Sequence, residues 1–305
     1  MQHVLLRTAL LALATTLGAC GGGGGDGDTL PAAVSVATAG TPLYSQVLLF
    51  TINGSNLDTG LAVSSAGCRG MTRSTTAPHI STASVAYYRC TVAAVCAQQA
   101  TVTRTSDGTL LSTVNYTVPE PQVTMNVSNG ASTGAGVVNG NLVITLKPAQ
   151  APITVDNFLA YVNSGFYDGT VFHRNSPGFV LQGGGYAAEV NPATPVRPPL
   201  KPTNNPIALE DNTGLSNVRL SVAMARTGAP DSATSQFFIN LGNNTFLNGS
   251  ATTRGYAAFG NVSAGADLVD AMAAAPCASY PALGLPAGDC LPFPNLVVLT
   301  ARQTR

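Results

Sequence analysis

The sequence predicts a mainly β protein with two helices, and three observations support this fold class. Charged residues make up only 9% of the 305 residues, whereas Gly and Pro, which favour turns, number 32 and 20. Short apolar runs that alternate with polar residues recur along the chain, as in half-buried strands. Apolar residues at helical spacing are found in two stretches of the second half. This composition is typical of a secreted protein with many turns.

The chain carries no net charge, because 14 Lys and Arg residues balance 14 Asp and Glu residues. A neutral chain has no long-range field that would attract nucleic acid or an anionic membrane surface. We therefore expect no nucleic-acid partner. The hydrophobic content of 45% is that of a globular protein, and the length allows two modest domains.

Residues 1–20 have the pattern of an export signal. Arg7 supplies positive charge, and the apolar run of residues 9–17 is too short to span a bilayer. The run ends in Leu-Gly-Ala before Cys20, which resembles a bacterial lipobox, whose Cys is lipidated. The alternative is an ordinary cleavage site with an incidental Cys.

The Gly-rich residues 21–32 favour the lipobox, because an anchored domain needs a flexible tether. Gly21 stands directly after the Cys, where Asp would imply retention in the inner membrane. We therefore predict a lipid anchor in the outer membrane, with the protein facing the periplasm of the cell envelope.

Residues 33–119 are predicted to form a small β sandwich. Residues 46–52 read as a strand that ends at Asn53-Gly54, and residues 101–105 are predicted to pair with residues 110–118 across a turn containing Asp107-Gly108. The block FTINGSNL resembles immunoglobulin-like modules of bacterial surface proteins. This domain is interpreted as a spacer or as a docking module for a partner protein.

The cysteines indicate an oxidising compartment. Cys277 and Cys290 flank a Pro- and Gly-rich loop, and we predict a disulfide between them. In the first domain Cys68 is predicted to pair with Cys90 or with Cys96, and the sequence does not choose between them. No cysteine spacing matches a zinc site, and the chain has only three His residues, so we predict no metal.

Residues 120–305 are predicted to form a second domain. Residues 123–127 and 142–146 alternate as strands, with a tight turn expected at Asn139-Gly140. Two helices are expected further on. The first is predicted from Thr154 as N-cap to Gly165, and the second from Ser263 as N-cap until Pro276 stops it. The apolar face of the first helix contains Val155, Phe158, Leu159 and Val162.

The stretch 165–186 reads as strand, turn, strand, turn and places Arg174 inside an aromatic-rich run. Arg174 either points to water from an edge strand or aims its rigid fork of donors at a specific partner. Residues 183–188 formally match a dinucleotide-binding glycine pattern. The prolines that follow exclude the helix which that motif must open, so the glycines are interpreted as a tight turn beside the site.

Three blocks in this order, FYDGTVFHR, PGFVLQGG and MARTGAPDSATSQFFIN, resemble the signature blocks of the cyclophilin family of peptidyl-prolyl isomerases, in particular the bacterial periplasmic type. The resemblance runs from about residue 122 to the C-terminus and implies a closed eight-stranded barrel with two helices. It implies rotamase activity on proline-containing unfolded or extended polypeptides, with no cofactor.

The same resemblance assigns residue roles. Arg174 is the catalytic donor, and Gln182 and Gln236 form hydrogen bonds with the peptide backbone. The matched blocks also supply the residues of the proline pocket and of the segment that pairs with the extended substrate. The remaining substrate-binding residues that it implies are Phe179, Val180, Ala225, Arg226, Phe238, Phe246, Leu247 and Tyr256.

Four of these residues depart from the better-known eukaryotic pattern. Arg226 stands where Asn is usual, and Val180 stands where Met is usual. Tyr256 replaces a pocket His, and Phe246 replaces a Trp. Because Phe246 lacks the indole N–H donor, cyclosporin affinity is in doubt. Two other function classes remain as alternatives, which are a chaperone-like peptide-binding module and an adhesive surface lipoprotein with little catalysis.

Overall fold

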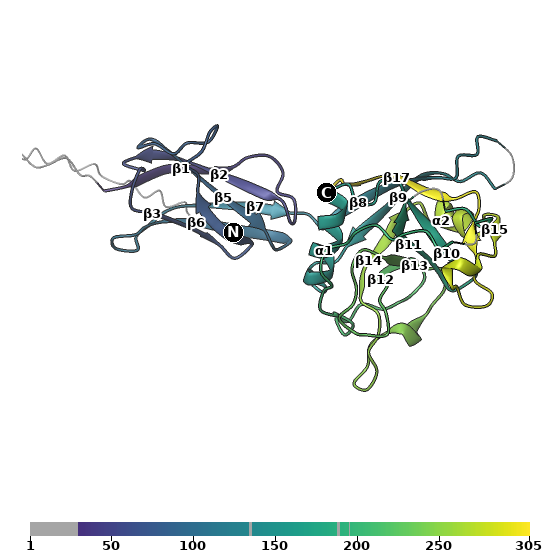
Figure 1. The fold of residues 1–305 in the computed structure, drawn as a ribbon. Helices are drawn as coiled ribbons and strands as arrows, with labels where there is room; N and C mark the ends of the chain where they lie inside the picture. Colours follow the sequence, from purple (N-terminus) through teal and green to yellow (C-terminus); the bar gives the residue numbers. More distant parts are fainter. Residues whose placement is uncertain (1–29, 134–135, 188–189, 195) are drawn as a thin grey trace, which may run out of the picture. The chain divides into compact units, whose positions relative to one another are not determined.

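The computed structural model describes residues 30–133, 136–187, 190–194 and 196–305 (Figure 1). The predicted signal peptide, its lipidation site Cys20 and residues 21–29 of the predicted tether lie outside the described residues. Within the described part, no helix is long and apolar enough to cross a membrane.

The N-terminal part of the chain forms two β sheets. Phe50 and Ile52 are fully buried, and the ring of Phe50 meets Tyr116 of the other sheet edge to face at 5.8 Å. Alternate residues of these strands face the space between the sheets, as the period of two requires. One sheet has the order β1 (Ala32–Thr38), β2 (Val47–Ser55), β5 (Val85–Val92), β4 (Cys68–Arg73), and the other has the order β3 (Leu61–Ser65), β6 (Cys96–Arg104), β7 (Leu110–Val118).

The predicted hairpin in this region is confirmed, whereas one strand end was predicted wrongly. β6 and β7 pair antiparallel, and Gly108 in their connection has φ +74°, which glycine adopts without strain. β2 does not end at Asn53-Gly54, because these residues pair with Ser35 and Ala33 of β1. A neighbouring strand therefore supplies backbone partners that the local turn signal does not reveal.

Both disulfides are defined in the structure. Cys68 is bonded to Cys90, which decides the pairing that the sequence left open, and Cys96 is exposed and unbonded. Cys68 and Cys90 lie on the adjacent strands β4 and β5, whereas Cys96 begins β6 in the other sheet. The predicted pair Cys277–Cys290 is confirmed, with Cα atoms 5.6 Å apart.

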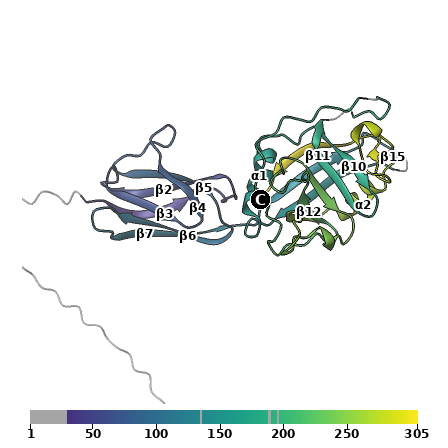
Figure 2. The ribbon, with the colours of Figure 1, turned by 60° about the horizontal axis from the view of Figure 1, so that its bottom comes forward.

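The rest of the chain forms a closed antiparallel barrel, which confirms the predicted fold class. Its strands follow one another around the barrel in the order β10, β11, β13, β12, β14, β9, β8, β17, and β17 pairs with β10 to close it; Figure 2 shows β10 and β11 side by side. The strands are β8 (Gln122–Ser128), β9 (Asn139–Leu146), β10 (Thr170–Ser176), β11 (Val180–Ala187), β12 (Ser221–Met224), β13 (Phe237–Asn240), β14 (Ala258–Ala264) and β17 (Leu296–Gln303).

Helix α1 (Pro152–Asn163) packs its predicted apolar face on the barrel core. Phe158 is fully buried, and its ring lies 5.5 Å from that of Phe237 and 5.0 Å from that of Phe259. Gly165, with φ +70°, follows the helix as predicted.

The predicted N-cap of α1 was wrong, because Thr154 lies inside the helix. The carboxylate of Glu210 takes the role of the cap. It accepts hydrogen bonds from the N–H groups of Ile153 and Thr154 at 3.2 and 2.7 Å. A carboxylate there satisfies free donors and complements the helix dipole.

Helix α2 (Ala266–Ala273) begins later than predicted. Ser263 is not its N-cap, because it lies in β14 and accepts a hydrogen bond from the Thr145 hydroxyl at 2.8 Å. Gly265 precedes the helix with φ +86°. The helix ends at Ala273, three residues before Pro276.

Two predicted turns are parts of strands. Asn139 and Gly140 pair with Ser128 and Val127 at the start of β9. Residues 183–185 lie within β11 and not in a tight turn. The glycines are needed there for close packing, since a Cβ on Gly184, which has φ +82°, would lie 2.9 Å from the Ser235 carbonyl oxygen.

Candidate active site

Nine of the eleven predicted catalytic and substrate-binding residues surround one cavity of about 180 Å³ on the barrel. The exceptions are Gln236, which lines the adjoining groove, and Phe246, which lies at the rim. The residues around the cavity come from β10, β11, β13 and the segments after β12 and before β14. They are Arg174, Phe179, Val180, Gln182, Ala225, Arg226, Phe238, Leu247 and Tyr256.

A single row of paired residues across four strands positions the centre of the site. Arg174 on β10 is the cross-strand partner of Gln182 on β11, and Gln182 is the partner of Phe238 on β13. Phe238 in turn is paired with Ala223 on β12. Directly opposed residues on one face of a sheet lie within side-chain contact. The barrel thus places a cation, an amide and an aromatic ring side by side.

The floor of the cavity is apolar and separate from the barrel core. Val180, Ala223, Phe238 and Ala258 form a buried cluster of their own. The neighbours Phe237 and Ile239 belong to the main core, because successive side chains of a strand point to opposite faces. The floor is therefore made of side chains that favour an apolar ring over water.

Arg174 is held at the wall of the cavity and does not extend into water. Its side chain is 21% exposed. Nε donates to Oδ2 of Asp289 at 2.6 Å, and Nη1 donates to Oε1 of Gln182 at 3.1 Å. The guanidinium carbon also lies 6.0 Å from the centre of the Phe179 ring. Of the two interpretations of Arg174, the structure therefore agrees with the one in which its donors are aimed.

The polar network continues to Gln236. Nε2 of Gln182 donates to Oε1 of Gln236 at 2.9 Å. Gln236 lies in an adjoining groove of about 270 Å³ that shares Gln182, Ala225 and Arg226 with the cavity. A Cβ on Gly185 would approach the Gln236 side chain to 2.8 Å, so the glycine leaves room for this amide.

Arg226 and Tyr256 form another part of the cavity wall. The Arg226 guanidinium stacks over the Tyr256 ring at 4.6 Å. Its Nε and Nη2 donate to the carbonyl oxygens of Gly255 and Arg254 at 2.9 and 3.0 Å. Backbone carbonyls therefore hold this cation over the ring.

Phe246 contributes to the rim and not to the cavity lining. It is 72% exposed, and its ring stacks on Phe179 at 5.8 Å with an interplanar angle of 18°. An exposed aromatic pair beside an apolar cavity offers a surface to a bound chain.

His173, next to Arg174 in the chain, faces away from the cavity. It is 4% exposed and meets the Tyr186 ring edge to face at 4.8 Å. Burial, and secondarily the positive charges of Arg174 and Arg197, lowers the pKa of His173 to about 4. In the described ranges, no three His, Cys, Asp or Glu side chains come together as metal ligands.

Sequence reasoning missed Asp289, which holds Arg174, and also Ala223 and Ala258 of the apolar floor. Asp289 lies 115 positions from Arg174 in the chain, outside every recognised motif block. The only local signal is its position beside Cys290, one half of the predicted disulfide. A contact between residues so far apart cannot be inferred from periodicity, because only the closed barrel brings them together.

Comparisons with known proteins agree with this geometry. The family model described as cyclophilin type peptidyl-prolyl cis-trans isomerase/CLD matches residues 131–283. A peptidyl-prolyl cis-trans isomerase of Acinetobacter baylyi is 48% identical over 141 residues, which are 46% of this chain and 71% of that protein. Peptidyl-prolyl cis-trans isomerase B of Escherichia coli is 46% identical over 135 residues, 43% of this chain and 77% of that protein.

Among solved structures, a cyclophilin type peptidyl-prolyl cis-trans isomerase of Cryptosporidium parvum matches with a TM-score of 0.45 and 22% identity, covering 61% of this chain and 98% of that one. The barrel and the family match define an enzyme of the isomerase class. The chain belongs to the cyclophilin-type peptidyl-prolyl cis-trans isomerase family.

Proposed function

We propose that this isomerase accelerates rotation about X-Pro bonds in exported polypeptides and so assists protein folding in the cell envelope. In this proposal, lipidated Cys20 anchors the protein to the outer membrane, where it faces the periplasm. Two disulfides, Cys68–Cys90 and Cys277–Cys290, support an oxidising compartment. Residues 33–119 serve as a spacer or bind a partner protein.

The observation that carries the mechanism is a fixed guanidinium at the wall of an apolar cavity. Rotation about the peptide bond is opposed by a barrier of about 18–20 kcal/mol, because the nitrogen lone pair is delocalised into the carbonyl. As the bond twists, the nitrogen regains its lone pair and can accept a hydrogen bond. Arg174 donates that bond, which stabilises the twisted state more than either planar isomer.

The other cavity residues hold the substrate. Val180, Phe238 and Leu247 receive the proline ring on the apolar floor. The amides of Gln182 and Gln236 bond the backbone of an extended peptide, which continues along Ala225 and Arg226 into the adjoining groove. An amide offers both a donor and an acceptor, which matches the two polar groups of a peptide unit.

The test is a proline-peptide rotation assay on the protein that lacks residues 1–20. Arg174→Ala should lower kcat by roughly tenfold to a hundredfold, since a hydrogen bond from a charged donor contributes about 1.5–3 kcal/mol. Phe238→Ala is the contrasting variant and should raise KM as well, because it empties the apolar floor.

The parent rate in Arg174→Ala, with an unchanged circular dichroism spectrum, would show that Arg174 is not the donor. If the parent protein bound the peptide without accelerating its rotation, the chaperone-like alternative would replace the catalytic proposal.

A further inference from the structure

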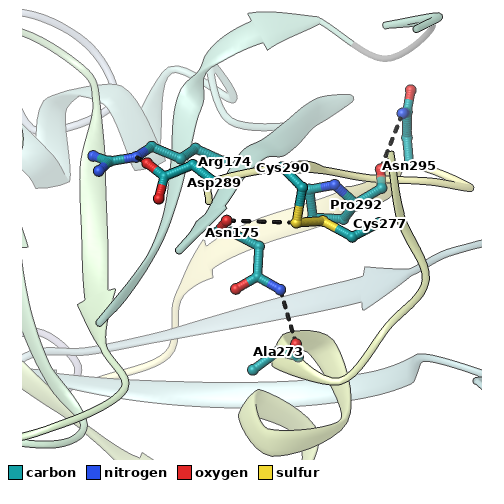
Figure 3. The surroundings of a disulfide bond; sticks show 8 residues. All are labelled: Arg174, Asn175, Ala273, Cys277, Asp289, Cys290, Pro292 and Asn295. Carbon is teal, nitrogen blue, oxygen red and sulfur yellow. Dashed lines mark hydrogen bonds and ion pairs between the residues drawn. A yellow bond between two sulfur atoms is a disulfide. The ribbon is translucent and has the colours of Figure 1, made fainter. Parts of the chain in front are cut away.

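A loop closed by the disulfide Cys277–Cys290 places the carboxylate of Asp289 against Arg174 (Figure 3). The loop follows α2 and contains Cys277, Asp289 and Cys290. The Asp289 side chain is only 6% exposed and contacts the guanidinium of Arg174 at 2.6 Å. Burying a carboxylate costs free energy unless a cation pairs with it, so Asp289 depends on Arg174 as its partner.

Backbone hydrogen bonds join the two segments that carry Arg174 and Asp289. The N–H of Asn175 donates to the carbonyl of Cys290 at 2.8 Å, and the N–H of Cys290 donates to the carbonyl of Asn175 at 2.9 Å. Each of these residues directly follows one member of the ion pair. The reciprocal bonds therefore fix the separation between the backbones that carry Arg174 and Asp289.

Further contacts fix the two ends of the loop and the strand beside it. The short strands β15 (Cys277–Ala278) and β16 (Leu291–Pro292) pair antiparallel on either side of the disulfide. The side-chain amide of Asn175 donates to the carbonyl of Ala273 at the end of α2 (Figure 3), at 2.8 Å. Asp289 therefore lies in a segment whose backbone is held by these contacts.

The contact at Nε restricts how the guanidinium can turn. Asp289 holds Nε and Gln182 holds Nη1, while Phe179 lies against the face of the fork. Within the described residues, Nη2 makes no hydrogen bond to protein, so the fork keeps a donor for a ligand. A free Arg side chain would lose considerable rotamer entropy on binding a ligand, whereas a side chain that these contacts already hold loses less.

We propose that Asp289 is a positioning residue for catalysis, which orients Arg174 through its Nε and is itself held by the loop that Cys277 and Cys290 close. This inference rests on the proposed role of Arg174 as the donor to the proline nitrogen. Asp289 lies beyond residue 283, where the family match ends.

The direction of the effect separates positioning from simple charge neutralisation. If Asp289 mainly weakened Arg174 as a donor, its removal would raise kcat. If Asp289 orients Arg174, its removal lowers kcat and leaves KM almost unchanged, because the apolar floor and the Gln182–Gln236 pair do not depend on it.

The experiment is a double-mutant cycle in the proline-peptide rotation assay. Asp289→Ala should lower kcat about three- to tenfold with KM within about twofold, the range expected for two coupled side chains in contact. Asp289→Asn, which keeps one acceptor oxygen, should recover most of kcat. In the Arg174→Ala background, Asp289→Ala should have no further effect, because the residue that it orients is gone.

Asp168→Ala is the matched control. Asp168 pairs with Arg302 at 2.7 Å in the same barrel but does not line the cavity. Its loss should lower stability without changing kcat. Nuclear magnetic resonance of the Arg174 Nε–H group gives a second readout, since this proton should exchange with water faster in Asp289→Ala than in the parent and at close to the parent rate in Asp289→Asn.

The outcomes are distinct. If Arg174→Ala lowers kcat but Asp289→Ala has a kcat equal to or above that of the parent, the positioning role alone is overturned. The positioning role is also overturned if Asp289→Ala lowers kcat by the same factor in the parent and in the Arg174→Ala background. Arg174→Ala at the parent rate overturns the donor role and the positioning role together. Should Asp289→Ala not fold, an Arg174 Nε–H proton that exchanges in the parent as fast as that of a fully exposed Arg overturns the proposal.

Discussion

Arg174 lies against the carboxylate of Asp289, so a substitution of Arg174 should lower stability in addition to its proposed effect on catalysis. Arg174→Ala leaves a carboxylate that is 6% exposed without its cation. We expect the variant to lose about 1–3 kcal/mol of stability, measured as a lower urea midpoint. Arg174→Ala/Asp289→Asn should regain most of this loss without regaining kcat. Equal midpoints in the single and double variants would contradict the buried pair.

His173 should make the protein sensitive to acid. Its pKa falls from 6.5 to about 4 on folding, chiefly because burial disfavours the charged ring. The unfolded chain therefore binds the proton at a higher pH than the folded one. The contribution of neutral His173 is complete above about pH 6.5 and declines as the pH falls towards 4, by about 3 kcal/mol in total. Below that pH both states are protonated.

The measurement compares urea midpoints between pH 7 and pH 4.5. His173→Leu should flatten the decline, because Leu fills much of the same volume and does not titrate. A His173→Leu protein that loses stability over this interval as steeply as the parent would show that another group is responsible.

At the scale of elements, we expect the loop between Cys277 and Cys290 to affect both stability and activity. The disulfide spans 13 positions and should contribute about 2–4 kcal/mol by restricting the unfolded chain. Cys277→Ser/Cys290→Ser should therefore unfold at lower denaturant. It should also lower kcat, but less than Asp289→Ala does, because the hydrogen bonds between Asn175 and Cys290 remain. An unchanged kcat in a destabilised variant would show that the disulfide has no part in holding Asp289.

In the two helices, the apolar face could be predicted from the sequence, whereas the N-terminal cap could not. The apolar face of α1 was predicted correctly, since four residues at helical spacing lie within one short segment. Its N-cap was not, because Glu210 reaches the helix from 56 positions further along the chain. The cap of α2 was missed for a related reason, since β14 pairs with β9 through residue 264 and delays the helix.

At the scale of the whole molecule, the proposed anchor decides where the enzyme works. Cys20→Ser should leave the protein soluble or retained as a precursor, because lipidation requires the thiol at that position. Fractionation of cells that express the parent and the variant measures this. Unchanged membrane association of Cys20→Ser would contradict the lipoprotein proposal while leaving the isomerase assignment intact.

By itself the sequence determined the fold class, the family and the residues that meet at the cavity, because these depend on local periodicity and on short blocks of fixed order. It also determined the Cys277–Cys290 pair, since two cysteines flank one short loop. Only the tertiary structure decided that Cys68 bonds to Cys90, that Glu210 caps α1 and that Asp289 holds Arg174. Each of these contacts joins segments distant in the chain, and their partners become neighbours only when the strands pair.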